Sequence, residues 1–120
     1  MKIIRRKFHV VLDYLSAVVL IAAPWLLGFS GSVTATAVAI IAGILILAMS
    51  FMTDYEGGIL RSIPMSMHLN MDILLGLALT LSPWVLAFKH EVYLPHVIMG
   101  LLAIFSGLFT VRTSAGRPLR

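Results

Sequence analysis

Residues 9–29 read HVVLDYLSAVVLIAAPWLLGF, and residues 68–88 read HLNMDILLGLALTLSPWVLAF. The two stretches align without a gap at an offset of 59 residues, and eight of the aligned positions are identical. Leucine matches are common between apolar segments, so the rarer residues carry the comparison. These are His9 with His68, Asp13 with Asp72, Pro24 with Pro83 and Trp25 with Trp84. Four such residues in a fixed order indicate an internal duplication.

The similarity continues towards the end of each repeat at an offset of 57 residues. The identical pairs there are Ile41 with Ile98, Gly43 with Gly100, Leu45 with Leu102 and Thr53 with Thr110. We therefore expect a single membrane domain over residues 1–120. It would comprise repeat one at about 8–53, a cytoplasmic linker at 54–66, repeat two at about 67–112 and a basic tail at 113–120.

The composition is that of a membrane protein. Apolar residues make up 60% of the 120 residues, charged residues make up 12%, and the mean hydropathy is +1.02, whereas soluble domains have about 45–50% and about 25%. Membrane-spanning helices need about 20 apolar residues, and such segments occur at roughly 9–29, 33–53, 67–88 and 93–111. The fold class predicted is all-α, a polytopic four-helix bundle of two tandem hairpins related as parallel repeats.

The distribution of basic residues predicts the orientation. Eight lie in the N-terminal segment, the linker and the tail (Lys2, Arg5, Arg6, Lys7, Arg61, Arg112, Arg117 and Arg120), and Lys89 is the single one between the spans of a hairpin. The positive-inside rule then places both termini in the cytoplasm, near anionic lipids. Basic ends around apolar segments do not form a nucleic-acid-binding face. A cleaved signal peptide over residues 1–25 is the alternative. Because Asp13 interrupts its apolar core, we expect this segment to remain in the mature protein.

Ser82-Pro83-Trp84, and Ala23-Pro24-Trp25 at the matching place in the first repeat, resemble the SPW-repeat family of small bacterial integral membrane proteins. That family is named for a Ser-Pro-Trp motif in the first of two membrane helices per repeat. The first copy departs from the motif because it has alanine in place of serine. The resemblance covers about 8–53 and 67–112, and it implies a location in the bacterial inner membrane but no reaction.

A polar stripe is predicted on the first helix of each repeat. His9 and Asp13 are four residues apart and lie on one side of a helix, and Pro24 lies eleven residues after Asp13, within about 20° of the same face. His68, Asp72 and Pro83 repeat this arrangement. Because ionisable groups in membrane helices avoid lipid, the stripes are expected to face the bundle interior and each other. Structural pairing and a proton relay or ligand pair both remain open.

The other notable side chains have simpler interpretations. Pro24 and Pro83 each free a helix carbonyl, which Ser82 could satisfy in the second repeat, or which could line a small polar pocket. Trp25 and Trp84 are expected to anchor at the headgroup level. Small residues (Ala35, Ala39 and Gly43; Gly100, Ala103 and Gly107) predict close helix packing, within the bundle or between protomers. His90 and His96 are expected to be solvated at the external face.

No reaction motif is present, and the absence of cysteine excludes disulfides, thiolate metal sites and cysteine nucleophiles. We expect no metal and no cofactor, although His9 and His68 could in principle bridge a haem iron. The expected function is that of a non-catalytic membrane scaffold or accessory subunit, not an enzyme, acting through helix packing in a homo-oligomer or larger complex. The alternative is a small oligomeric proton or cation transporter that uses Asp13 and Asp72.

Overall fold

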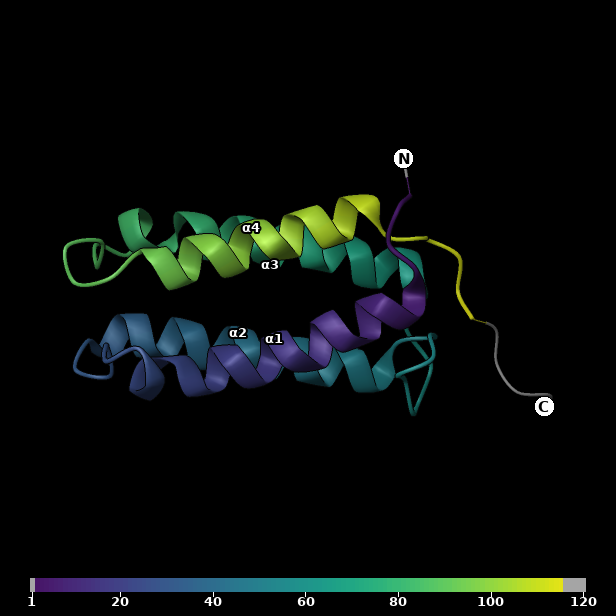
Figure 1. The fold of residues 1–120 in the computed structure, drawn as a ribbon, viewed down its shortest axis with the longest axis horizontal. Coiled ribbons are helices and arrows are strands. Elements are labelled where there is room, and N and C mark those ends of the chain that lie inside the picture. The colour runs from purple at the N-terminus through teal and green to yellow at the C-terminus, as the bar shows by residue number, and fades with distance from the viewer. Residues whose placement is uncertain (1, 116–120) are drawn as a thin grey trace.

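Four helices form the protein in a computed structural model that describes residues 2–115 (Figure 1). Their bounds are α1 Arg6–Leu26, α2 Val33–Met52, α3 Met65–Val85 and α4 Leu94–Phe109. The four helices confirm the all-α prediction and start and end within a few residues of the predicted spans. Of the predicted basic tail at 113–120, residues 116–120 lie outside the described residues, and Arg117 and Arg120 are among them.

Three of the helices, α1, α2 and α3, are long and apolar enough to cross a membrane. At about 1.5 Å per residue, the 21 residues of α1 extend over roughly 31 Å, close to the thickness of a hydrocarbon core. The fourth helix is apolar but has 16 residues, so it is shorter than the span predicted at 93–111. Large apolar side chains are exposed along all four helices, where they suit contact with lipid.

Each repeat forms a hairpin in which α1 packs along α2 and α3 packs along α4. The two hairpins lie side by side, with the turn inside each hairpin at one end and both ends of the described chain at the other (Figure 1). Glycine permits the close approach within each hairpin, because a Cβ on Gly43 would lie 2.9 Å from the Ala17 carbonyl oxygen. A Cβ on Gly100 would lie 2.6 Å from the equivalent oxygen of Gly76. The strips of small residues therefore pack inside the bundle.

Two equivalent short bridges join the hairpins at the end that carries the termini. The Ile4 amide donates to Phe109 at 2.9 Å and the Val111 amide donates to Ile4 at 3.0 Å. In the same pattern, Ile63 donates to Met52 at 2.7 Å and Asp54 donates to Ile63 at 2.8 Å. The end of α4 is thus tied to the start of α1, and the end of α2 to the start of α3. The two bridges are related by the pseudo-two-fold symmetry expected of a parallel repeat.

The carbonyl freed by the second proline is satisfied as the sequence predicts. The Ser82 hydroxyl donates a hydrogen bond of 2.8 Å to the Leu79 carbonyl oxygen, which Pro83 leaves without its helical partner. This oxygen is therefore not free to line a pocket. Both Pro24 and Pro83 are buried, on the inward side of α1 and α3.

The prediction that His96 is solvated was wrong, whereas His90 is exposed. Pro95 lies at the start of α4, so His96 falls within the first turn of that helix and points into the bundle. Its ring is 1% exposed and lies near Phe29 and Phe88, with centroid distances of 5.4 and 4.8 Å. Its Nε2 is 2.9 Å from the Ala35 carbonyl oxygen. The first-turn position and this backbone acceptor allow a polar ring to be buried.

Candidate functional site

Four ionisable side chains meet in the centre of the bundle near the end that carries the termini. We call His9, Asp13, His68 and Asp72 the His–Asp quartet; all four are buried, with at most 5% of any residue exposed. Within each helix the histidine and aspartate are one turn apart, at 3.1 Å in α1 and 3.3 Å in α3. Each stripe thus forms its own pair, as the spacing predicts.

Contacts between the helices are as short as those within them. His9 Nε2 lies 2.9 Å from Asp72 Oδ2, and His68 Nε2 lies 3.0 Å from Asp13 Oδ2. The two stripes therefore face each other across the bundle, as the sequence predicts. Since each imidazole reaches both carboxylates, the four side chains form one unit that joins the two repeats.

The outer nitrogen of each histidine contacts a threonine from the other repeat. His9 Nδ1 lies 2.8 Å from Thr110 Oγ1, and His68 Nδ1 lies 2.6 Å from Thr53 Oγ1. The Thr53 hydroxyl donates its proton to the Met49 carbonyl oxygen at 2.6 Å. It must then accept from His68, so Nδ1 of His68 carries a proton and its Nε2 faces the carboxylates. The threonines orient the rings.

A tyrosine from the linker closes one side of the quartet. Tyr55 is 0% exposed, and its hydroxyl donates to Asp13 Oδ2 at 2.7 Å. Its ring lies beside His68, with the centroids 5.3 Å apart. Burial and the nearby Asp13 charge raise the pKa of Tyr55 well above its ordinary value, so the phenol stays protonated and can donate. At the equivalent position the second repeat has Arg112, which bonds instead to Ser66 and Asn70.

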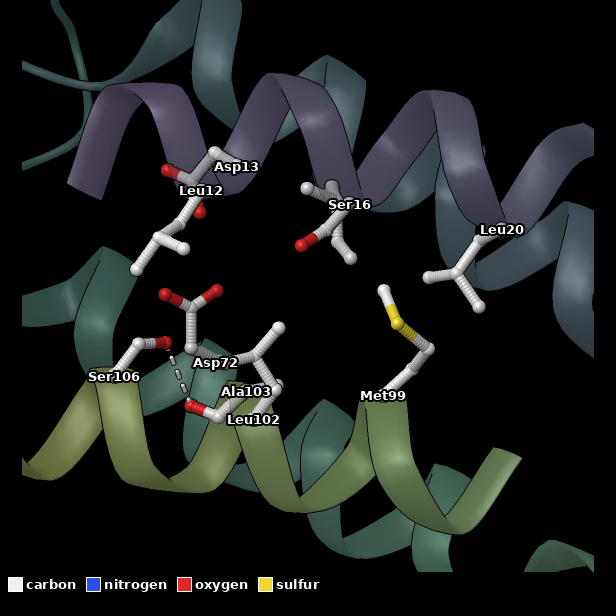
Figure 2. Close-up of a pocket in the computed structure, with 10 residues that line it drawn as sticks. Leu12, Asp13, Ser16, Leu20, Asp72, Met99, Leu102, Ala103 and Ser106 are labelled. Atoms are coloured by element: carbon white, nitrogen blue, oxygen red, sulfur yellow. Dashed lines mark hydrogen bonds between the residues drawn. The ribbon is translucent and has the colours of Figure 1, made fainter. Parts of the chain in front are cut away.

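A small cavity continues from the two carboxylates towards the middle of the bundle. Its volume is about 20 Å³, which is enough for one water molecule. Asp13 and Asp72 border it together with Ser16 and Ser106, and Leu20 and Met99 border its far end (Figure 2). Figure 2 shows the two carboxylates projecting from opposite sides into this space. The polar part of the interior therefore extends only a short way beyond the quartet before apolar side chains surround it.

The remaining predicted site residues lie apart from the quartet. Pro24 and Pro83 follow the aspartates by eleven residues, roughly 16 Å along each helix. The Ser82 hydroxyl donates its hydrogen bond to the Leu79 carbonyl oxygen. Trp25 and Trp84 are 63% and 49% exposed near the other end, so an anchoring role remains a prediction.

A haem held between His9 and His68 does not fit this arrangement. The two imidazole rings are 5.4 Å apart between centroids and nearly perpendicular, at 76°. Both Nε2 atoms face the same carboxylates, and the adjoining cavity holds about 20 Å³, far less than a porphyrin requires. The bridging haem considered from the sequence is therefore wrong.

Three residues of the site are not predicted by the patterns in the sequence. Thr53 and Thr110 were visible as an identical pair at the ends of the repeats. Each of them contacts the histidine of the other repeat, so the contacts depend on how the two hairpins pack. Tyr55 lies in a segment with the composition of a solvated linker. No pattern in the sequence distinguishes its buried ring from Glu56, Ile59 and Leu60, the exposed residues that follow it.

Comparison with known proteins supplies the family. Residues 7–110 match the SPW repeat domain, which is most of the chain and includes both hairpins and the whole quartet. No match was found among curated proteins or among solved structures. The matched region contains both Pro-Trp positions and the apolar helices. The chain is therefore a multi-pass membrane protein that belongs to the SPW repeat family.

Proposed function

We propose that this protein is a non-catalytic membrane scaffold or accessory subunit that acts through helix packing. The observation that carries the proposal is the quartet itself. Its ionisable groups are directed at one another and at Thr53, Thr110 and Tyr55, with at most 5% of each residue exposed. Groups arranged in this way hold two hairpins together and leave little room for a substrate.

The orientation belongs to the same proposal. The N-terminal segment, the linker and the start of the C-terminal segment lie at one end of the bundle (Figure 1), and these segments contain most of the basic residues. This supports cytoplasmic termini in a bacterial inner membrane, with anionic lipids as neighbours. Reporter fusions at Asp54 and at the C-terminus should behave as cytoplasmic, and a fusion after Gly31 as external. An external signal from the C-terminal fusion would contradict the orientation.

A proton or cation transporter is the second candidate, and the cavity beside Asp13 and Asp72 is the observation in its favour. Transport also requires a polar path through the rest of the bundle. Beyond the quartet, α1 from Tyr14 to Leu26 has no charged residue, nor has α3 from Ile73 to Val85. The apolar outer half therefore favours the scaffold.

Substitution of Asp13 separates the two candidates. Asp13→Asn keeps the shape and most hydrogen bonds, so a structural role predicts a mild loss of stability. Asp13→Leu leaves both histidines and Tyr55 without this carboxylate, at a cost of about 1–3 kcal/mol for each unsatisfied buried group. Asp72→Leu should be less harmful than Asp13→Leu, because the tyrosine hydroxyl bonds to Asp13.

Flux measurements in liposomes complete the test. The purified wild-type protein should carry no proton or cation current above that of protein-free vesicles. The result that would contradict the scaffold is measurable flux that Asp13→Asn abolishes while the variant keeps the thermal stability of the wild type. A relay predicts that outcome, because only a titratable group can pass protons.

A further inference from the structure

Beyond this proposed function, the geometry points to a metal site: the quartet binds one divalent first-row transition ion of the Zn²⁺ class. His9 and His68 contribute Nε2, and Asp13 and Asp72 contribute one carboxylate oxygen each. These four ligand atoms lie within 4.8 Å of one another. Two nitrogens and two oxygens supplied by the protein would form a closed set, and closure by four protein ligands is typical of structural zinc sites.

The separations between the ligand atoms fit this class of ion. Zinc bonds to nitrogen at about 2.0–2.1 Å and to carboxylate oxygen at about 2.0–2.2 Å, so the edges of a tetrahedral site measure roughly 3.3–3.5 Å. With Asp13 Oδ2 and Asp72 Oδ2 as the ligand oxygens, three nitrogen-to-oxygen distances are 2.9, 3.0 and 3.3 Å, and His9 Nε2 lies 3.1 Å from the other oxygen of Asp13. Small movements of the side chains, including rotation of the Asp13 carboxylate, would therefore accommodate the ion, because the ligand atoms already lie within 4.8 Å of one another.

An unpartnered ring nitrogen is a second, independent observation. His68 is 0% exposed, and its Nε2 makes no hydrogen bond of acceptable direction to any described residue, although two carboxylate oxygens lie within 3.3 Å. A nitrogen that points between two oxygens, and at neither of them, lies close to both without a well-directed hydrogen bond. Because Nδ1 donates to Thr53, the neutral ring presents the Nε2 lone pair to that gap. Metal-bound histidines have the same outer hydrogen bond as a rule.

Charge and ligand type favour a transition ion. Two carboxylates neutralise a dication, so the loaded quartet has no net charge, which suits a membrane interior. Imidazole nitrogens suit Zn²⁺ and its neighbours, whereas Mg²⁺ and Ca²⁺ prefer oxygen ligands. Without a metal, one added proton on each imidazole would likewise balance the charges of the two carboxylates. Binding therefore exchanges one dication for up to two protons.

From the sequence we expect no metal, and neither repeat alone carries more than half of the ligand set. One histidine and one aspartate on a helix do not make a closed site. The second half is supplied by the packing of the hairpins, which brings α1 and α3 together at the quartet.

The experiment uses the full chain, purified in detergent without a histidine tag and stripped with a chelator. Titration with Zn²⁺ by calorimetry, in two buffers of different ionisation enthalpy, measures both stoichiometry and proton release. We expect one ion per chain, release of protons on binding, and no binding of Mg²⁺. Substitution by Co²⁺ should give the intense visible absorption of a tetrahedral site, whereas surface binding gives the weak bands of an octahedral one.

Variants assign the site. Asp72→Asn should weaken Zn²⁺ binding about 100-fold or more, since loss even of an outer hydrogen-bond partner costs about 10–100-fold. Thr53→Val tests that outer shell and should weaken binding about 10–100-fold. His90→Gln is the matched control, because His90 is exposed, and it should bind like the wild type.

Three outcomes would overturn the proposal. If the wild type binds no Zn²⁺, the quartet is an ion-pair cluster balanced by protons alone. Loss of binding in His90→Gln, or weak octahedral Co²⁺ bands, would assign the metal to the surface. Should Asp72→Asn fail to fold, the Co²⁺ spectrum and proton release of the wild type still decide, because neither depends on a variant.

Discussion

Removal of one oxygen atom tests the contribution of Tyr55 to the quartet. Tyr55→Phe keeps a ring that is 0% exposed and lies beside His68, but it deletes the hydroxyl that donates to Asp13 at 2.7 Å. Hydrogen bonds to charged groups are worth about 1.5–3 kcal/mol. Since both histidines still contact Asp13, we expect the lower half of that range, or roughly a 10- to 40-fold change in the unfolding equilibrium constant.

The other two tyrosines of the chain provide matched controls. Tyr14 donates to the Gly57 carbonyl oxygen at 2.7 Å and is partly buried, so Tyr14→Phe should cost about 0.5–1.5 kcal/mol, as for a neutral acceptor. Tyr93 is 47% exposed, and Tyr93→Phe should change stability by less than about 0.5 kcal/mol. The expected order of destabilisation is therefore Tyr55, Tyr14, Tyr93.

Unfolding in mixed micelles, followed by circular dichroism against denaturing detergent, measures all three variants on one scale. The reasoning is refuted if Tyr55→Phe unfolds with the same free energy as Tyr93→Phe. In that case the quartet does not depend on the linker hydroxyl, and the burial of Tyr55 reflects packing of its ring alone.

Two further predictions concern the hairpins and the linker. Gly100→Ala should destabilise the protein by about 1–3 kcal/mol in the same unfolding assay, because the new Cβ would lie 2.6 Å from the Gly76 carbonyl oxygen. Gly31→Ala is the control and should be nearly neutral, because a Cβ at that position meets no atom within 4 Å. The hydrogen bond from Arg6 lowers the pKa of Glu56, so this ion pair stabilises the fold above the ordinary pKa of about 4.5 and is lost as the pH falls through the lowered value. The stability difference between the wild type and Glu56→Gln, about 0.2–1 kcal/mol at neutral pH, should therefore vanish in acid, and a difference that grows in acid would contradict this assignment.

Much of the fold followed from local patterns. Apolar length and the turns at glycine and serine predict the four helices, and the spacing of His9 and Asp13 predicts the inward stripe, because both depend on helix geometry alone. The Ser82 hydrogen bond was predictable for the same reason, since donor and acceptor lie on one helix turn.

The rest depends on contacts between segments far apart in the chain. Tyr55 is buried because the linker folds back over the quartet, and His96 is buried because its ring fits between Phe29 and Phe88. Composition favours solvent exposure for both positions. The proposed metal ligand set was likewise not visible in either repeat, since its halves meet only after the hairpins pack.

The exchange of threonines between the repeats has a consequence for the origin of the chain. Thr53 orients the histidine of the second hairpin, and Thr110 orients that of the first. An ancestor with one hairpin would obtain each of these contacts by pairing with a second copy of itself about a two-fold axis, through a self-complementary interface. Fusion of two such copies into one chain would leave them free to diverge, and Tyr55 and Arg112 differ at one equivalent position of the two repeats.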